Sequence, residues 1–517
     1  MGKRAKAPAR PNIVLFMMDT QGAVNMSCYG YRRKTTPHIE ALAKEGCLFE
    51  NHFVTAPWTL PVHASLFTGR YESGHGAGAQ HEGLEPGLPS LPAVFAKNGY
   101  RTVALNNNYW AVNKTQWSAG QGFGEIIHYN DPRIRPVAPF LPSADPDERD
   151  KGALKGIGVA LKWIEDHGRK ARRKPFLMYF NAYDIHDPFH PPEPFRRRFL
   201  LEGLRREDVR QERSWQNPAT IGDVCPTFDQ WMALASLKDA NTACVDDRLG
   251  RLLEALRERG VLEHTIFILT GDHGDCLGQH VGYALHSQNG VYDHVCKTPL
   301  IIRWPRRFKP GSRCAQLVQI VDLFPTLMEL TGIRDPEAEA SIAGRSLLEA
   351  LKGPTRPFAL LEAQRSVQTL RLTWSTAEDA ENADPRFMNV AYKAARAKRY
   401  KYIWASNGQD ALFDIVKDPD ERWNIIQSKP AVARKLRKAM EEMLMSMEQR
   451  YYPDMMTPDR QLRFPPAVVT SALRRLAAWG LYQPGIVPAW NEKSRKEAAR
   501  WLKNWGRKRR ALLRSTE

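Results

Sequence analysis

Short apolar runs alternate with helical patterns along the first 330 residues of the chain. Three of the runs, residues 12–18, 175–180 and 265–270, are apolar at nearly every position. Such strands are typical of parallel sheets covered on both faces, because neither side of the strand meets water. Strands that alternate with helices over this length predict an α/β fold, a doubly wound and mostly parallel sheet with helices on both faces.

The helical patterns have apolar positions three or four residues apart. The most regular one covers residues 237–259, with Leu249, Leu252 and Leu256 on one face and Gly260 after the last turn. Shorter helices are predicted after Thr36, at 92–97 and at 152–166, and a strand at 102–105 delivers Asn106, Asn107 and Asn108. Residues 131–150 are interpreted as a loop and residues 192–230 as a charged insertion.

The pattern changes from about residue 356. Residues 400–404 and 411–414 resemble short antiparallel strands, and a helix is predicted at 431–451. Because 517 residues exceed one ordinary domain, we divide the chain into three parts. They are a catalytic domain (1–355), a smaller C-terminal α+β subdomain with a small antiparallel sheet (356–450) and a basic extension bearing Trp501 and Trp505 (451–517).

Composition narrows the class of protein. The chain is 43% apolar and 26% charged, and no apolar run approaches membrane-spanning length, so no integral membrane segment is expected. The first apolar run ends on Asp19 instead of a cleavage site, and the seven cysteines lack regular spacing; both favour a cytoplasmic protein with reduced thiols. A net charge of +18 favours anionic partners. We expect a small anionic ester and not a nucleic acid, and composition leaves the oligomeric state open.

Polar side chains with metal-binding chemistry follow each of the three long apolar runs: Asp19; Asp184 and His186; Asp272 and His273. The carboxyl ends of strands are where open α/β sheets bind ligands. Thr59 lies beside Pro61 at a predicted helix start, where free N–H groups favour an anion. Taken alone, Thr59 is better explained as a simple helix cap. Together, carboxylates, imidazole and a hydroxyl suit a divalent cation that activates a nucleophile.

In order and spacing, the chain from Pro11 to about Ile426 resembles the sulfatase family of the alkaline phosphatase superfamily. The segments that carry the resemblance are Thr59-Leu-Pro-Val-His63 with Thr68-Gly-Arg70, similar to the nucleophile signature C-x-P-S-R followed by TGR; Asp184-Ile-His186-Asp187-Pro188, similar to the segment of the catalytic histidine; and Asp272-His273-Gly274-Asp275, similar to the second metal-ligand motif. The resemblance implies an alkaline-phosphatase-like fold and a metal-dependent ester hydrolase.

The resemblance also implies roles for individual residues. Asp19, Asp272, His273 and the Thr59 hydroxyl are expected to bind one divalent cation: Ca²⁺, Mn²⁺, Zn²⁺ or Mg²⁺. Thr59 is the expected nucleophile and His186 the general acid, and His63 joins them as a catalytic residue. His286, Asn107 and Arg70 are expected to bind the substrate, with His286, His63 and Asn107 donating to its non-bridging oxygens.

Four positions depart from the family pattern. Thr59 replaces the Cys or Ser that sulfatases oxidise to formylglycine; oxidising its β-carbon would give a ketone. Thr20 replaces a carboxylate, and Asn107 and His63 replace a Lys and an Arg. A covalent phospho-threonine can be hydrolysed, whereas a plain threonine sulfate lacks the exit that a geminal diol provides. We therefore expect hydrolysis of sulfate or phosphate/phosphonate esters, with phosphorus favoured. The alternatives are a phosphoryl transferase that uses an alcohol acceptor and a non-catalytic descendant that binds an anion.

Overall fold

The computed structural model describes residues 10–79, 83–137, 140–143, 145, 148–170, 174–203, 227–280, 286, 290–364 and 390–447. Its main sheet has eight strands in the order β4–β3–β5–β1–β6–β7–β2–β8. They are β1 (Asn12–Met18), β2 (Cys47–Phe53), β3 (Arg101–Leu105), β4 (Glu125–Ile127), β5 (Phe176–Ala182), β6 (Thr265–Gly271), β7 (Leu300–Arg303) and β8 (Ser312–Gln319). Within this sheet β7 runs antiparallel to β6 and β2, and the other pairs are parallel. The predicted mostly parallel α/β fold is confirmed.

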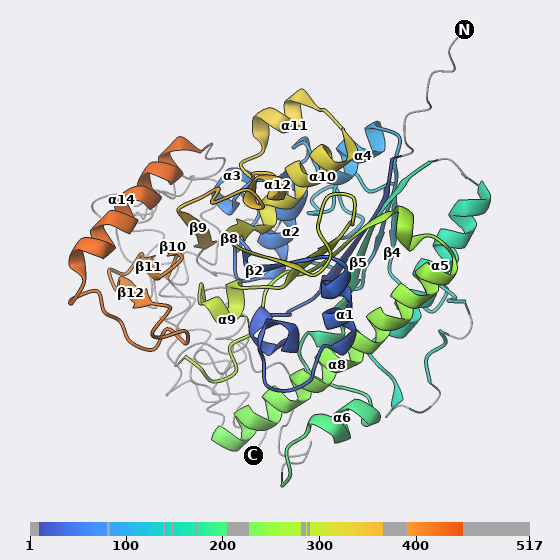
Figure 1. The fold of residues 1–517 in the computed structure, drawn as a ribbon, viewed down its shortest axis with the longest axis horizontal. Coiled ribbons are helices and arrows are strands. Elements are labelled where there is room, and N and C mark those ends of the chain that lie inside the picture. The colour runs from blue at the N-terminus through green and yellow to red at the C-terminus, as the bar shows by residue number, and fades with distance from the viewer. Residues whose placement is uncertain are drawn as a thin grey trace, which may run out of the picture.

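Helices cover both faces of the sheet (Figure 1). On one face, Val14 and Phe16 of β1 join a core with α1 (Pro37–Glu45), α5 (Ala153–Lys170) and α8 (Phe228–Glu258). On the other, Ile13 and Leu15 join a core with α2 (Thr59–Thr68), α4 (Leu91–Lys97) and α10 (Leu323–Thr331). Because successive side chains of a strand point to opposite faces, β1 must be apolar at nearly every position.

Helix α8 begins nine residues earlier than the apolar pattern predicts. Thr227 and Gln230 form a capping box, in which each side chain accepts a hydrogen bond from the other residue's backbone N–H. The additional turns place Ala233 and Leu234 in a small separate core with Phe189. The Thr-x-x-Gln signal was therefore present in the sequence. The segment interpreted as an insertion also contains α6 (Glu193–Phe199).

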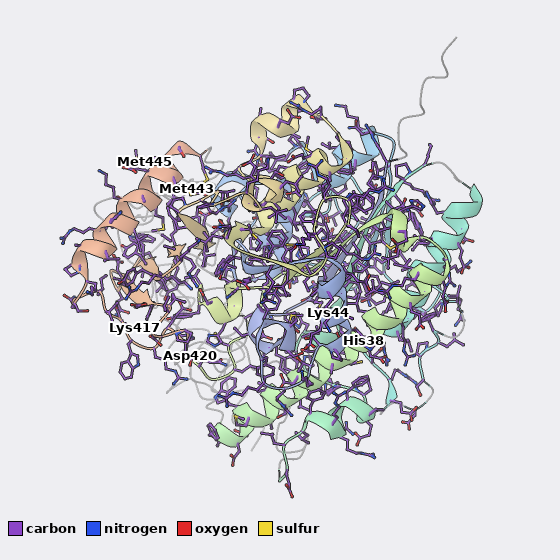
Figure 2. The ribbon with its side chains drawn as sticks, in the orientation of Figure 1. His38, Lys44, Lys417, Asp420, Met443 and Met445 are labelled. Carbon is purple, nitrogen blue, oxygen red and sulfur yellow. The ribbon has the colours of Figure 1, made fainter. Side chains whose placement is uncertain are left out.

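A second sheet, of four antiparallel strands, follows residue 356. Its order is β12 (Ala411–Asp414), β11 (Tyr400–Ala405), β10 (Tyr392–Ala397) and β9 (Phe358–Ala363). Helix α14 (Pro430–Ser446) packs on it through Met440 and Leu444, which belong to the same core as Ile13. Figure 2 shows Met443 and Met445 of this helix on the side of the molecule away from His38 and Lys44 of α1. The remaining short helices are α3 (Glu72–His75), α9 (Asp293–Cys296), α11 (Pro336–Ser341) and α12 (Leu347–Ala350).

The division into parts at residue 355 remains a prediction, and the extension with Trp501 and Trp505 lies outside the described residues. Within the described part of the chain, no helix combines the length and apolar character needed to cross a membrane.

Candidate active site

Three buried side chains meet at the carboxyl ends of two neighbouring strands. β1 and β6 are parallel partners, with Met18 opposite Gly271, so the residues that follow them, Asp19 and Asp272, emerge side by side. His273 is the next residue, and all three side chains are fully buried. One ligand atom from each lies within 4.8 Å of the others. The structure thus brings together the three predicted metal-binding side chains.

The hydrogen bonds of these carboxylates fit a divalent cation. One oxygen of each is satisfied: Asp19 Oδ2 accepts from Asn108 and Asn181, and Asp272 Oδ1 accepts from the backbone N–H of Thr20 and His273. The other oxygens, Asp19 Oδ1 and Asp272 Oδ2, are buried with no hydrogen-bond partner among the described residues. Burial and the charge of Asp19 raise the pKa of Asp272 well above its ordinary value. A cation between these oxygens would offset both costs.

The imidazole of His273 is also in a state that can bind a cation. Its Nδ1 lies 3.3 Å from the carbonyl oxygen of Gly274, so Nδ1 carries the proton and donates it. Burial, and then the neighbouring His286, lowers the pKa of His273 well below its ordinary value. The ring is therefore neutral, with the Nε2 lone pair available to a cation.

Thr59 is the first residue of α2, with Trp58 as its N-cap. Its hydroxyl oxygen lies 3.3 Å from Nε2 of His273 and 3.5 Å from Nδ2 of Asn108. The helix start adds the positive end of the helix dipole and free backbone N–H groups. The Thr59 oxygen thus faces the metal-binding group within bonding range of its ligands.

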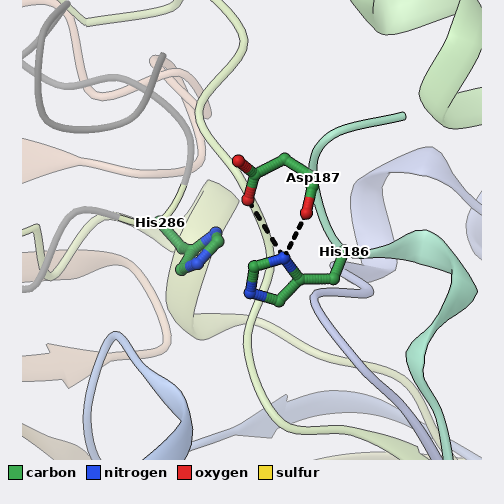
Figure 3. Close-up of side chains that lie close together, drawn as sticks. All are labelled: His186, Asp187 and His286. Atoms are coloured by element: carbon green, nitrogen blue, oxygen red, sulfur yellow. Dashed lines mark hydrogen bonds and ion pairs between the residues drawn. The ribbon is translucent and has the colours of Figure 1, made fainter. Parts of the chain in front are cut away.

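A second group of side chains adjoins this one (Figure 3). His186 follows β5 after one short turn, and its Nδ1 donates to the backbone oxygen of Asp187 at 2.7 Å, with the Asp187 carboxylate at 3.1 Å. Burial acts to lower the pKa of His186, but the hydrogen bond and charge of Asp187 outweigh it and raise the pKa to about 9. The centroid of the His286 ring lies 4.7 Å from the ring centroid of His186 and 4.6 Å from that of His273. His286 therefore bridges the two groups.

His286 is oriented from behind by a buried ion pair. Its Nδ1 lies 2.8 Å from the carboxylate of Asp275, and Lys238 of α8 contacts the other oxygen of that carboxylate. Lys238 also donates to the backbone oxygen of Thr20 at 2.7 Å. Burial acts to raise the pKa of Asp275, but the charges and hydrogen bonds of Lys238 and His286 together outweigh it, and the pKa lies below its ordinary value. The sequence analysis did not identify Lys238, although its signal was a charged residue on the buried face of a long helix.

Asn108 is a site residue that the sequence analysis did not single out, and the substrate contact expected of Asn107 stays a prediction, since the Asn107 Nδ2 is buried without a hydrogen-bond partner among the described residues. Asn108 donates to Asp19, whereas the Asn107 side-chain oxygen accepts from the backbone of Asn130, in the turn after β4. Asp184 is not one of the residues whose ligand atoms come together with Asp19, and one of its carboxylate oxygens accepts from the backbone N–H of Lys151. All of these residues follow strand ends, as expected, but only the turn geometry determines which side chain faces the site.

His63 and Arg70 differ from their predicted roles. His63 Nδ1 donates to the Thr59 backbone oxygen at 2.7 Å, and Nε2 accepts from the Tyr179 hydroxyl at 2.6 Å. Both ring nitrogens are thus engaged, which leaves neither for a substrate oxygen. Arg70 follows the far end of α2, which is about 15 Å long, and lines a groove beside α14 with a volume of about 650 Å³. The geometry therefore assigns His63 to holding the first turn of α2 and separates Arg70 from Thr59.

Comparisons with known proteins agree with this geometry. A family model described as "Sulfatase" matches residues 11–333, and one described as "N-sulphoglucosamine sulphohydrolase, C-terminal" matches residues 282–450. The chain is similar to an ulvan-active sulfatase of Formosa agariphila, with 27% identity over 402 residues, covering 78% of this chain and 67% of that protein. It is also similar to an arylsulfatase of Clostridium perfringens, with 24% identity over 492 residues and coverage of 86% and 96%.

Among solved structures, the phosphonate monoester hydrolase of Agrobacterium radiobacter is similar, with a TM-score of 0.65 and 19% identity; the match covers 84% of this chain and 95% of that one. At this identity the likeness shows the fold alone. The first family model covers more than half of the sequence. The chain therefore belongs to the sulfatase family, within the hydrolases of sulfuric and phosphoric esters.

Proposed function

We propose that this protein is a metal-dependent hydrolase of phosphate or phosphonate esters in which Thr59 is the nucleophile and His186 the general acid. The observation that carries the proposal is the position of the Thr59 hydroxyl oxygen, 3.3 Å from Nε2 of His273, beside two carboxylates that each keep one buried oxygen unpaired. Asp19, Asp272, His273 and Thr59 would hold the cation.

A divalent cation bound there supplies positive charge that favours the Thr59 alkoxide and stabilises the oxygens of the ester. Asn108 holds Asp19 through its amide, and its N–H group lies 3.5 Å from the Thr59 oxygen. His63 fixes the backbone of Thr59, because it bonds the carbonyl oxygen of that residue. These contacts keep the nucleophile in one orientation before a substrate arrives.

His186 supplies the proton that the leaving alcohol needs. Attack of the Thr59 oxygen on phosphorus forms one P–O bond and breaks the bond to the alcohol, whose oxygen takes a proton from His186. His186 Nδ1 is held by Asp187, so Nε2 is the nitrogen that exchanges the proton. Water then cleaves the phospho-threonine and returns a proton to His186. A pKa of about 9 keeps His186 protonated at neutral pH, as a general acid requires.

Threonine at the nucleophile position favours phosphorus over sulfur. A threonine side chain cannot become an aldehyde hydrate, so a sulfate attached to it would leave only by direct attack of water. A phosphoryl group on threonine remains open to that attack. The similar sulfatases and phosphonate monoester hydrolases show that the fold serves both kinds of ester.

The test compares phosphate, phosphonate and sulfate esters of one alcohol on a single preparation, with Mn²⁺ and with chelator. We expect metal-dependent release of alcohol from the phosphorus esters and a lower rate from the sulfate ester. Thr59→Val, which keeps the shape and removes the hydroxyl, should abolish turnover, whereas Thr59→Ser should retain part of it. Mass spectrometry of acid-quenched wild type should locate a phosphoryl group on Thr59.

Metal-independent turnover that survives in Thr59→Val would contradict the proposal. Formation of a new ester when an alcohol is added would instead identify a transferase. A protein that binds Mn²⁺ and phosphonate but turns over no ester would be the non-catalytic relative.

A further inference from the structure

Three large aromatic side chains are exposed on the segment that follows Asn108. Tyr109, Trp110 and Trp117 are 59%, 41% and 43% exposed, although large apolar side chains are usually buried. They border a groove of about 340 Å³, whose other lining residues include Leu60, Asn113 and Thr115. A concave surface with exposed aromatic rings is typical of a binding site.

Two of the residues that line the groove are close in sequence to Thr59 and to Asn108. Leu60 directly follows Thr59 in α2, and Trp110 is two residues from Asn108, whose amide lies 3.5 Å from the Thr59 oxygen. Trp58, the residue before Thr59, packs edge-to-face on Trp110 with ring centroids 5.8 Å apart. The aromatic segment therefore packs against the turn that carries Thr59.

The Asn113 and Thr115 side chains in the groove bond to each other and to the backbone. The Asn113 side-chain oxygen accepts from both the backbone N–H and the hydroxyl of Thr115, and its amide donates to the backbone oxygen of Tyr109. None of the described lining residues carries a charge. A sugar ring would need hydrogen-bond partners around its edge, whereas an aromatic ring needs only ring faces and edges.

We propose that Tyr109, Trp110 and Trp117 form a binding site for the alcohol part of the ester, and that this part is an uncharged group with an aromatic ring. The inference rests on the proposed function, because it assigns the groove to the leaving group of the Thr59 reaction. It names a substrate class that the metal-binding group alone does not select.

The test measures binding with phosphonic acids, which contain no ester bond, by calorimetry on the full chain with Mn²⁺. Benzylphosphonate is compared with ethylphosphonate and with the phosphonate analogue of glucose 6-phosphate. One or two ring contacts predict about 10-fold tighter binding of the benzyl compound. Tyr109→Ala and Trp117→Ala should each lower this preference about 3-fold and leave the affinity for ethylphosphonate unchanged. Trp423→Ala, which removes a ring that is 73% exposed, is the matched control and should change neither affinity.

Equal affinity of wild type for benzyl and ethyl compounds, or tighter binding of the sugar analogue, would overturn this inference while Thr59-dependent turnover of esters stood. A benzyl preference that persists in both Tyr109→Ala and Trp117→Ala would place the ring elsewhere and overturn it too. Absence of Thr59-dependent turnover would overturn the proposed function and this inference with it.

Discussion

The contact between His186 and Asp187 predicts where activity is lost as pH rises. A general acid must be protonated, so the rate falls above its pKa. Two of the influences that raise the pKa of His186 to about 9, a hydrogen bond and a negative charge, come from Asp187, and burial acts in the opposite direction. Asp187→Asn removes the charge and nearly preserves the shape. Burial then dominates, and the pKa of His186 should fall to its ordinary 6.5 or below.

The size of the effect follows from the fraction of protonated imidazole. At pH 8 a group with a pKa of about 9 is roughly nine-tenths protonated, and one with a pKa of 6.5 is about 3% protonated. The rate at pH 8 should therefore fall about 30-fold in Asp187→Asn, whereas the rate at pH 5.5 should change little. A bound cation shifts the pKa in both proteins alike, so the comparison holds.

The assay is kcat/KM against pH for an ester of a simple alkanol, whose departure needs a proton. Asp184→Asn is the matched control, because Asp184 is a neighbouring buried carboxylate that accepts a hydrogen bond from the backbone N–H of Lys151. Its profile should overlay that of wild type. A nitrophenol departs without needing a proton. With an ester of that alcohol, wild type and Asp187→Asn should therefore have the same dependence of kcat/KM on pH. If Asp187→Asn kept the wild-type profile, His186 would not be the acid that sets it.

Three further predictions concern neighbouring groups. Asn108→Ala should lower kcat about 10- to 100-fold, since it removes a donor beside Thr59, and Asn107→Ala should change kcat far less; steady-state kinetics of the two variants measures both. Lys238→Met should lower the free energy of unfolding by about 3–5 kcal/mol, because it removes the lysine partner of the buried Asp275 carboxylate. The exposed Lys97→Met should cost under about 1 kcal/mol. Urea denaturation of both variants tests this, and equal losses would refute it. Asp272 has a raised pKa in the folded protein, so without a cation the folded state holds more protons than the unfolded one above pH 3.8 and stability falls as pH rises. The gain in melting temperature on adding Mn²⁺ should therefore be larger at pH 8 than at pH 5, and an equal gain at both would contradict it.

The sequence predicted the fold because its strongest signals are local. The apolar runs at 12–18, 175–180 and 265–270 became β1, β5 and β6 with ends shifted by at most two residues. Once these strands are parallel neighbours, their carboxyl ends must meet, which brings Asp19 to Asp272 and His273. The metal-binding group was therefore predictable from strand order alone.

Side-chain direction in the turns could not be predicted in the same way. Asn106, Asn107 and Asn108 follow one strand, and the choice among them depends on contacts with Asn130 and Asp19, which lie far away in the sequence. The position of His63 depends on Tyr179, 116 residues later. The family pattern suggested a substrate contact for His63, but a neutral, buried imidazole with both nitrogens bonded serves the helix instead. Burial lowers the pKa of His63 to about 4, consistent with that state.

The replacement of a carboxylate by Thr20 and the burial of Lys238 have one electrostatic explanation. Asp19, Asp272 and Asp275 bring three negative charges into a region closed to water, Lys238 brings one positive charge, and a divalent cation would bring two. These charges cancel, so a further carboxylate at position 20 would leave a buried negative charge beside the place where an anionic ester must bind. Thr20 avoids that charge, and its backbone still donates to Asp272 and accepts from Lys238. Its hydroxyl oxygen is buried without a hydrogen-bond partner among the described residues. The lost carboxylate is therefore part of a charge balance that suits an anionic substrate, and this balance weighs against a site that has decayed.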